Sequence, residues 1–304
     1  MGYYQNSGRG GPYPGPVTSP GDRAKAFLAL HRRGEPLLLP NPWDPGSARL
    51  LASLGYQALA TTSGGFAATL GRFDGSATAE EALGHAAAVV AATHLPVSAD
   101  LEDAFARDPT GVAITVTRAA AIGLAGCSVE DFTRQADEPI YDLGLAVERV
   151  AAAAEVAHGG SCPLVLTART ERHLHGATDL AATVDRLQRF ADAGADVVFA
   201  PGVIDLPDVA RLVSELDRPV NVLVTRGAPP VAALAGVGVA RISLGSGLAL
   251  AALGSAVEAA RQLLEQGTYG WFAPASVGRK AAAVAFGDAS PEAGGGISLG
   301  DPGG

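Results

Sequence analysis

The sequence predicts an α/β fold of the (β/α)8 TIM barrel type, a ring of eight parallel strands surrounded by helices. The main observation is an eightfold alternation of short apolar runs and amphipathic helical stretches over roughly 250 residues. Strands that alternate with helices run parallel and are joined by right-handed crossovers. An open doubly wound sheet is the alternative, but no G-x-G-x-x-G motif follows the first strand.

The elements are expected in regular order along the chain. Residues 1–20 are rich in Gly, Pro, Tyr and Ser and predict a disordered arm, and 23–31 predict a short helix. The strands are expected at 37–40, 57–61, 96–100, 126–130, 164–169, 196–200, 220–225 and 241–244. The helices are expected near 45–54, 77–93, 111–122, 142–158, 178–193, 206–216, 229–236 and 247–266. The barrel domain would therefore span 21–267, followed by a docking segment at 268–285 and a disordered tail at 286–304.

Three consecutive strands end in a charged residue, namely Asp100, Glu130 and Arg169. Side chains alternate along a strand, so each shares a face with a hydroxyl residue two positions earlier, while the opposite face is apolar. We expect the hydroxyl and charged residues to line the barrel interior. Glu102, two residues after Asp100, would point the same way on extended backbone. Active sites of barrel enzymes lie at this end of the strands.

Carboxylates dominate the predicted site. Asp100, Glu102 and Glu130 converge from neighbouring strands, and Asp74 follows the second strand. Oxygen ligands without His or Cys suit a hard cation such as Mg²⁺ or Mn²⁺. A solvated acidic rim is the alternative interpretation.

Groups that bind anions lie beside these acids. Ser63, Gly64 and Gly65 follow the second strand, where glycines let backbone N–H groups approach an anionic ligand. Arg169 can hold a carboxylate or a phosphate bidentately, or it can balance the acids structurally. Asn221, on the inward face of the seventh strand, is a further candidate contact to the substrate.

Composition excludes several classes of function. The net charge of −9 argues against nucleic acid as a partner, and no apolar run reaches the roughly 18 residues of a membrane span. The two cysteines, Cys127 and Cys162, fit a reduced cytoplasmic protein. The two lysines, Lys25 and Lys280, lie outside the predicted strands, which excludes a Schiff-base lysine in the barrel.

Several segments together resemble the isocitrate lyase/phosphoenolpyruvate mutase superfamily, in the same order and over roughly residues 25–265. They are Asn41–Arg49, Gly55–Gly65, Leu95–Asp103, Ser128–Asp131, Leu166–Thr170 and Ala193–Asp196. The resemblance implies a barrel enzyme that uses Mg²⁺ to act on small 2-oxo acids or their enolates. It also implies a homotetramer, often with the C-terminal helix exchanged between subunits.

The resemblance also implies roles for individual residues. Asp100 would bind the cation directly, and the other three acids, Asp74, Glu102 and Glu130, would hold its waters. The segment Ser63–Gly65 would hold the substrate carboxylate. Arg169 would bind the substrate. Within this set we expect Ser63, Glu130 and Arg169 to take part in catalysis.

The chain departs from the superfamily pattern at three places. Glu102 stands where Asp is usual, and 104–106 read Ala-Phe-Ala in place of Gly-aromatic-Gly. The segment 132–139 lacks the Lys-x-Cys-Gly-His motif of the lyases and the Lys- and Asn-containing loop of the mutases. The general acid or base is therefore open between Asp131, Arg134, Glu138 and a cation-bound water.

Three hypotheses of function follow. The leading one is a Mg²⁺-dependent lyase, or a related hydrolase, that cleaves a C–C bond in a small 2-oxo or 2-hydroxy carboxylic acid. The second is a phosphonomutase acting on a compound like phosphoenolpyruvate. The third is a barrel without catalytic activity that binds a small acid.

Overall fold

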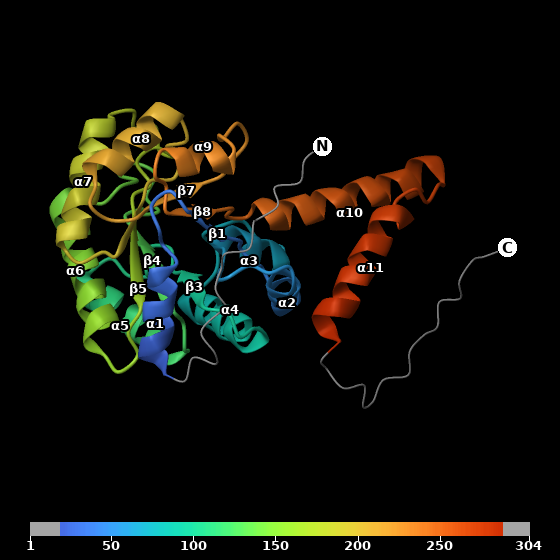
Figure 1. Cartoon of the computed structure of the whole chain (residues 1–304), viewed down its shortest axis with the longest axis horizontal. Coiled ribbons are helices and arrows are strands. Elements are labelled where there is room, and N and C mark those ends of the chain that lie inside the picture. The colour runs from blue at the N-terminus through green and yellow to red at the C-terminus, as the bar shows by residue number, and fades with distance from the viewer. Residues whose placement is uncertain (1–18, 288–304) are drawn as a thin grey trace. The chain divides into compact units, whose positions relative to one another are not determined.

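The computed structural model describes residues 19–287 and confirms the barrel (Figure 1). Eight parallel strands form one sheet in the order β1-β8-β7-β6-β5-β4-β3-β2. The strands are β1 Leu37–Leu39, β2 Leu59–Ala60, β3 Val97–Asp100, β4 Gly126–Glu130, β5 Val165–Arg169, β6 Val197–Phe199, β7 Val220–Leu223 and β8 Arg241–Ser243. The helices are α1 Pro20–Ala29, α2 Pro45–Ser53, α3 Ser63–Thr69, α4 Ala79–Ala92, α5 Pro109–Ala121, α6 Leu143–Gly159, α7 Leu180–Asp192, α8 Leu206–Glu215, α9 Val231–Gly236, α10 Gly247–Gln266 and α11 Phe272–Phe286.

The ring is nearly closed between its first two strands. Strands β1 and β2 are not paired in the sheet, but the Ala60 N–H donates to the Pro40 carbonyl at 3.1 Å. On its other edge, β2 pairs in parallel with β3. All the strand C-termini therefore meet at one end of the barrel.

Local sequence signals set where the helices begin. Asp44 and Ser47 form a reciprocal capping box at the start of α2, and Thr78 and Glu81 form another at α4. Proline in the first turn of α2 and α5 has the fixed backbone angle that suits a helix start.

Two buried clusters confirm the predicted strand faces. The outer cluster, between strands and helices, contains the apolar residues that alternate with the polar ones, such as Val97, Cys127 and Ala168. The inner cluster contains Phe27 of α1 with residues that begin the strands, among them Val165. Phe27 thus fills the N-terminal mouth of the barrel, and the polar inward faces are left toward the C-terminal end.

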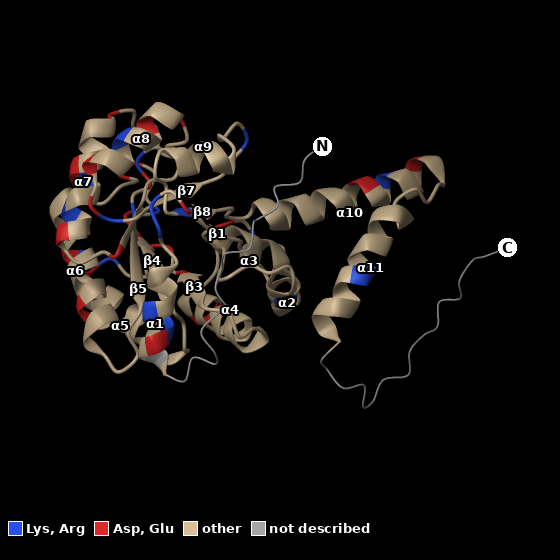
Figure 2. Ribbon diagram, in the orientation of Figure 1, with Lys and Arg blue, Asp and Glu red and all other residues tan. Residues whose placement is uncertain are grey.

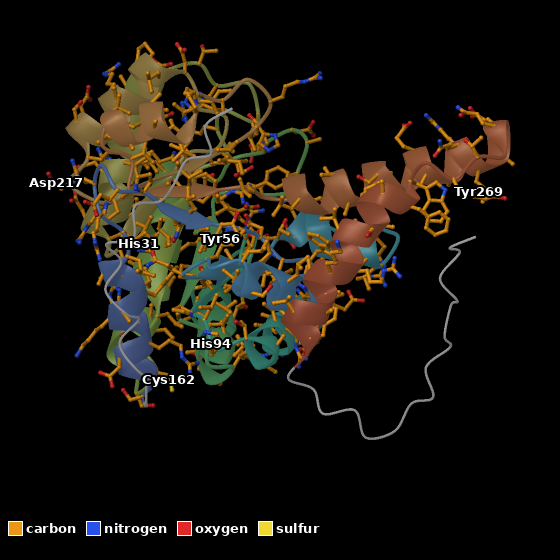
Figure 3. All side chains as sticks on the ribbon, turned by 45° about the vertical axis from the view of Figure 1, so that its right-hand side comes forward. His31, Tyr56, His94, Cys162, Asp217 and Tyr269 are labelled. Carbon is orange, nitrogen blue, oxygen red and sulfur yellow. The ribbon has the colours of Figure 1, made fainter. Side chains whose placement is uncertain are left out.

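A polar network with a buried cation lies in the barrel interior. Arg241 donates through Nε to Asn221 Oδ1 at 2.9 Å and through Nη1 to Thr167 Oγ1 at 3.0 Å. His31, at the end of α1 in Figure 3, lies 3.4 Å from Arg241 Nη1 through Nε2 and 2.9 Å from the Phe27 carbonyl through Nδ1. A neutral imidazole that donates from Nδ1 and accepts at Nε2 satisfies both contacts. Burial and the neighbouring Arg241 lower the pKa of His31 to about 3.

Some expectations need correction. Residues 63–69 form α3, with Thr62 as the N-cap, and no helix was predicted from the sequence at this position. Helix α1 begins at Pro20, whereas we expect a helix from residue 23 and an arm up to residue 20. The rest of the predicted arm and all but two residues of the predicted tail lie outside the described residues. Among residues 19–287, no helix is long and apolar enough to cross a membrane.

The chain divides into two units between Gly254 and Ser255, within α10. The first unit contains the barrel. The second contains the rest of α10 together with α11, which occupies most of the predicted docking segment at 268–285. The predicted end of the barrel domain at residue 267 falls in this second unit.

The His31 network predicts a pH-dependent stability. The pKa of His31 in the folded protein, about 3, lies below its ordinary value of 6.5, so the unfolded chain binds more protons between these values. The free energy of unfolding should therefore fall as the pH drops from about 6.5, by up to about 1.4 kcal/mol per pH unit from this one group. Urea unfolding between pH 7 and pH 4.5 measures this slope. His31→Gln should lack this component, and identical pH profiles for the two proteins would contradict the assignment.

Candidate active site

Asp100, the last residue of β3, joins the loops at the C-terminal ends of two strands. Its Oδ2 accepts from the Ser63 hydroxyl at 3.0 Å and from the Ser63 N–H at 3.3 Å. Its backbone N–H donates to Thr61 Oγ1 at 2.9 Å. The predicted direct cation ligand and the predicted anion-binding Ser63 therefore lie side by side.

Arg169, the last residue of β5, points into a group of carboxylates. Its Nε lies 3.3 Å from Glu130 Oε2 and donates to Glu171, and its Nη1 lies 3.9 Å from Asp100 Oδ1. Burial alone would lower the pKa of Arg169, but Glu130, Glu171 and Asp100 together raise it above its ordinary value. The guanidinium is therefore permanently charged, and the predicted convergence of Asp100, Glu130 and Arg169 is confirmed.

Glu102 reaches the site by a turn that we did not predict. Strand β3 ends at Asp100, and Glu102 has a left-handed φ of 52°, so the extended backbone expected between them is wrong. The Asp100 Oδ1 atom accepts from the Glu102 N–H at 3.2 Å, which stabilises this turn. Asp100 nevertheless lies close enough to raise the pKa of Glu102, so the two acids do belong to one cluster.

The acid cluster contains more carboxyl groups than cationic side chains. Arg134 Nη2 lies 2.8 Å from Glu102 Oε2 and 3.1 Å from Asp103 Oδ1. Burial, followed by repulsion from Asp100, raises the pKa of Glu102 to about 7 despite Arg134. Burial is also the main cause that raises the pKa of Glu130 well above its ordinary value.

Asp74 borders the same cluster from the loop after β2. A Cβ atom added at Gly64 would lie 3.0 Å from Asp74 Oδ2, and one added at Gly75 would lie 3.8 Å from Glu102 Oε2. Asp74 also contributes to the raised pKa of Glu102. The segment 63–65 and the four predicted cation-binding acids therefore lie at one end of the barrel.

Asp131 is one of the four candidates for the general acid or base, and its carboxylate is engaged in hydrogen bonds within the protein. It is 2% exposed, and its carboxylate accepts from the Thr170 hydroxyl at 2.7 Å, the Glu171 N–H at 2.8 Å and Arg186 Nη1 at 2.9 Å. These contacts favour a structural role. Arg134 is paired with Glu102, and Glu138 is exposed in the segment 132–140.

The structure places Asn221, the predicted substrate contact on β7, in the polar network of the barrel interior. Both sides of its amide are engaged, because Asn221 accepts from Arg241 and donates to Ser243 Oγ at 3.0 Å.

The donor chemistry of the cluster fits a hard divalent cation. Asp100, Glu102 and Glu130 offer only oxygen atoms, the donors that Mg²⁺ prefers. Burial raises the pKa of Glu102 and Glu130, and a divalent cation beside them would favour their charged forms. Within residues 19–287, however, no three His, Cys, Asp or Glu side chains are close enough together to hold one ion directly. This arrangement suits one direct carboxylate ligand with the other acids acting through water, as Mg²⁺ sites often do.

Glu171 and Asp103 are site residues that the sequence did not predict. Glu171 lies two residues after Arg169, and it forms an ion pair with that arginine. Its position just beyond a charged strand end, like that of Glu102 after Asp100, is the signal in the sequence. Asp103 had no assigned role, and its partner Arg134 comes from a loop that no motif connects to it.

The eight-stranded barrel, with carboxylates and an arginine at the C-terminal end of its strands, has the architecture of a barrel enzyme, and comparison with known proteins gives the family. The phosphoenolpyruvate phosphomutase family matches residues 27–264, so the chain belongs to that family and to the isocitrate lyase/phosphoenolpyruvate mutase superfamily. A solved structure from Burkholderia cenocepacia J2315, proposed to be a lyase/mutase, is 45% identical with a TM-score of 0.83. The match covers 86% of this chain and 95% of that one.

Curated relatives extend this result. An uncharacterised Mycobacterium tuberculosis protein is 34% identical over 78% of this chain and 88% of its own length. The 2-methylisocitrate lyase of Salmonella typhimurium is 29% identical over 70% of this chain and 73% of its own length. An oxaloacetate decarboxylase from Chromohalobacter salexigens is 28% identical over 79% and 85%. The chain is therefore an enzyme of a superfamily whose members act on small acids.

The charge surplus predicts that the acid cluster destabilises the cation-free protein. The folded pKa of Glu102, about 7, lies above its ordinary value of 4.5, so its contribution to stability is lost as the pH rises between these values. In EDTA at pH 8, Glu102→Gln should therefore raise the free energy of unfolding by roughly 1–3 kcal/mol. Urea unfolding at pH 5 and pH 8 measures the difference in the free energy of unfolding between Glu102→Gln and the wild type, which should be small at pH 5. A variant less stable than the wild type at pH 8 would contradict the destabilising role of the Glu102 carboxylate.

Proposed function

We propose that the chain is a Mg²⁺-dependent lyase that cleaves a C–C bond in a small 2-oxo or 2-hydroxy carboxylic acid. The observation that carries the proposal is the acid cluster itself. Among the described residues, the five carboxyl groups of Asp100, Glu102, Asp103, Glu130 and Glu171 form ion pairs only with the guanidiniums of Arg134 and Arg169. A divalent cation would balance the charge of such a group of buried carboxylates.

The residues divide into cation-binding and substrate-binding groups. Asp100 would bind Mg²⁺ directly, and the other acids, Asp74, Glu102 and Glu130, would hold its waters. When bound, Mg²⁺ supplies a Lewis acid that stabilises negative charge developing on a substrate oxygen.

Arg169 is the main anion-binding group of the proposed site. Its Nε is turned toward Glu130 and Glu171, while Nη1 lies on the side of Asp100. A substrate carboxylate beside Asp100 would therefore meet a fixed, charged donor. Ser63 and the N–H groups of Gly64 and Gly65 would hold the carboxylate from the other side, and this fixed arrangement favours the charged transition state.

A substrate panel assay with and without Mg²⁺ tests the proposed reaction. The panel contains oxaloacetate, 2-methylisocitrate, isocitrate, 2,3-dimethylmalate, phosphonopyruvate and phosphoenolpyruvate. Metal-dependent cleavage of a 2-oxo or 2-hydroxy acid is the expected result. Turnover of only the two phosphorus compounds would instead establish the phosphonomutase alternative. Mg²⁺ binding without any turnover would favour the acid-binding barrel.

Substitutions at the two strand ends should separate their roles. Asp100→Ala should lower kcat/KM by about 10³-fold or more, because the direct cation ligand is lost. Arg169→Met should lower kcat/KM by about 10²-fold or more without weakening Mg²⁺ binding, because it removes a substrate contact and leaves the acid cluster more negative. Steady-state kinetics and calorimetric Mg²⁺ titration measure both effects. Full metal-dependent activity in Asp100→Ala would show that the proposed site is wrong.

We also propose that the enzyme is a homo-oligomer, with a tetramer as the expectation. Helices α10 and α11 carry few charged residues (Figure 2) and many exposed apolar side chains. They are Leu250, Leu253, Val257, Leu263, Leu264, Phe272, Val277, Val284 and Phe286. Exposed apolar surface of this extent is typical of an interface.

Light scattering coupled to size-exclusion chromatography tests the assembly. Replacing Leu264 and Val277 with Glu should shift the mass of the wild-type assembly toward that of a single chain, since both side chains are highly exposed. The control variant replaces exposed Ile114 on α5 with Glu and should leave the mass unchanged. A wild-type mass equal to one chain would refute the proposal.

A further inference from the structure

The loop that carries Glu102 has an unfavourable backbone conformation. Glu102, Ala104 and Phe105 have φ angles of 52°, 58° and 52°, all in the left-handed region. A Cβ atom disfavours this region because it approaches the following carbonyl oxygen, so three such residues within four positions need external support. Because Glu102 is one of the three, whatever supports the loop also sets the position of its carboxylate.

Arg149 of α6 supplies this support from behind the loop. Its side chain is almost fully buried, with the residue 1% exposed. Nη2 donates to the Asp103 carbonyl at 2.7 Å, and Nη1 donates to the Arg107 carbonyl at 2.8 Å and to the Ala106 carbonyl. The guanidinium also faces the Tyr141 ring at 4.1 Å. No carboxylate of the described residues forms an ion pair with Arg149, so its hydrogen bonds serve the loop backbone.

Two neighbouring contacts complete the support. The Thr115 hydroxyl of α5 donates to the Ala104 carbonyl at 2.8 Å, and the Phe105 N–H donates to Asp103 Oδ1 at 3.0 Å. Arg149 and Thr115 together therefore bind the carbonyls of residues 103, 104, 106 and 107. This leaves the loop little freedom to relax to ordinary backbone angles.

The opposite side of the same loop faces the acid cluster. Glu102 and Asp103 pair there with Arg134, whose guanidinium lies 5.5 Å from the centre of the Phe105 ring. Two arginines thus hold the loop, with Arg149 on the backbone and Arg134 on the carboxylates.

We propose that Arg149 is a positioning residue for the divalent-cation site, acting through the backbone of residues 102–107. It holds the left-handed turn that directs the Glu102 carboxylate into the cluster beside Asp100. The inference rests on the proposed function only for the existence of the cation site. Arg149 itself touches neither the cation nor the substrate.

Mg²⁺ affinity, measured by calorimetry without substrate, tests the role of Arg149. Arg149→Met should weaken Mg²⁺ binding about 10- to 100-fold, the usual effect of losing support behind a cation ligand. Arg149→Lys, which keeps the charge and three donors, should recover part of this affinity. Arg241→Met is the matched control, since it removes another buried guanidinium whose hydrogen bonds lie in the barrel interior. It should keep the wild-type Mg²⁺ affinity.

A second pair of variants distinguishes positioning from simple stabilisation of the fold. Thr115→Val removes one hydrogen bond to the loop with little change in volume and should weaken Mg²⁺ binding several-fold. Ala104→Gly relieves left-handed strain, because Gly adopts this region freely. The double variant Arg149→Met/Ala104→Gly should therefore bind Mg²⁺ at least threefold more tightly than Arg149→Met alone.

The outcomes separate the two claims. If folded Arg149→Lys and Thr115→Val both bind Mg²⁺ within twofold of the wild type, the positioning role is refuted, whether or not Arg149→Met folds. If the wild-type chain binds no Mg²⁺ at all, the cation site of the proposed function is refuted, and the positioning role falls with it. Weaker Mg²⁺ binding in Arg149→Met, Arg149→Lys and Thr115→Val would support the proposal, provided that Arg241→Met keeps the wild-type affinity.

Discussion

Crowding of carboxylates around Arg169 is the constraint on which the rest of the site depends. Asp100, Glu130 and Glu171 approach this single guanidinium from β3, β4 and the loop after β5. The strand register brings them together, because Asp100 pairs with Ser128 and Glu130 with Arg169. A barrel that ends three adjacent strands in this way concentrates charge that the protein alone does not balance. The proposed cation and an acidic substrate follow from that imbalance.

The surrounding structure keeps this unfavourable arrangement in place. Burial of the large apolar cluster between strands and helices stabilises the fold, whereas the left-handed turn after β3 costs stability. Ordinary loops relax such strain, but Arg149, Thr115 and Arg134 hold this one between α5, α6 and the segment after β4. Backbone strain at a functional site commonly lowers the stability of a protein while supporting its activity.

The barrel and the strand ends of the site could be predicted from the sequence because both depend on local periodicity. Alternation of faces placed Asp100, Glu130 and Arg169 together, and the structure confirms their convergence. The position of Glu102 could not be predicted in this way, because a left-handed turn replaces extended backbone after Asp100. The role of Arg149 could not be predicted from the sequence either, because its hydrogen bond to Asp103 joins residues 46 positions apart. Helix α3 was missed because Ser-Gly-Gly reads as a turn, although Thr62 is a good N-cap.

Localisation of Mn²⁺ by anomalous diffraction, in crystals soaked with this cation, tests whether Asp100 is the direct ligand of a divalent cation. One strong peak is expected within about 2.5 Å of an Asp100 carboxylate oxygen. Glu102 and Glu130 should contact this ion through ordered water. A peak bound elsewhere, or crystals that take up no Mn²⁺ while Arg169 keeps its carboxylate partners, would show that no such site exists at Asp100.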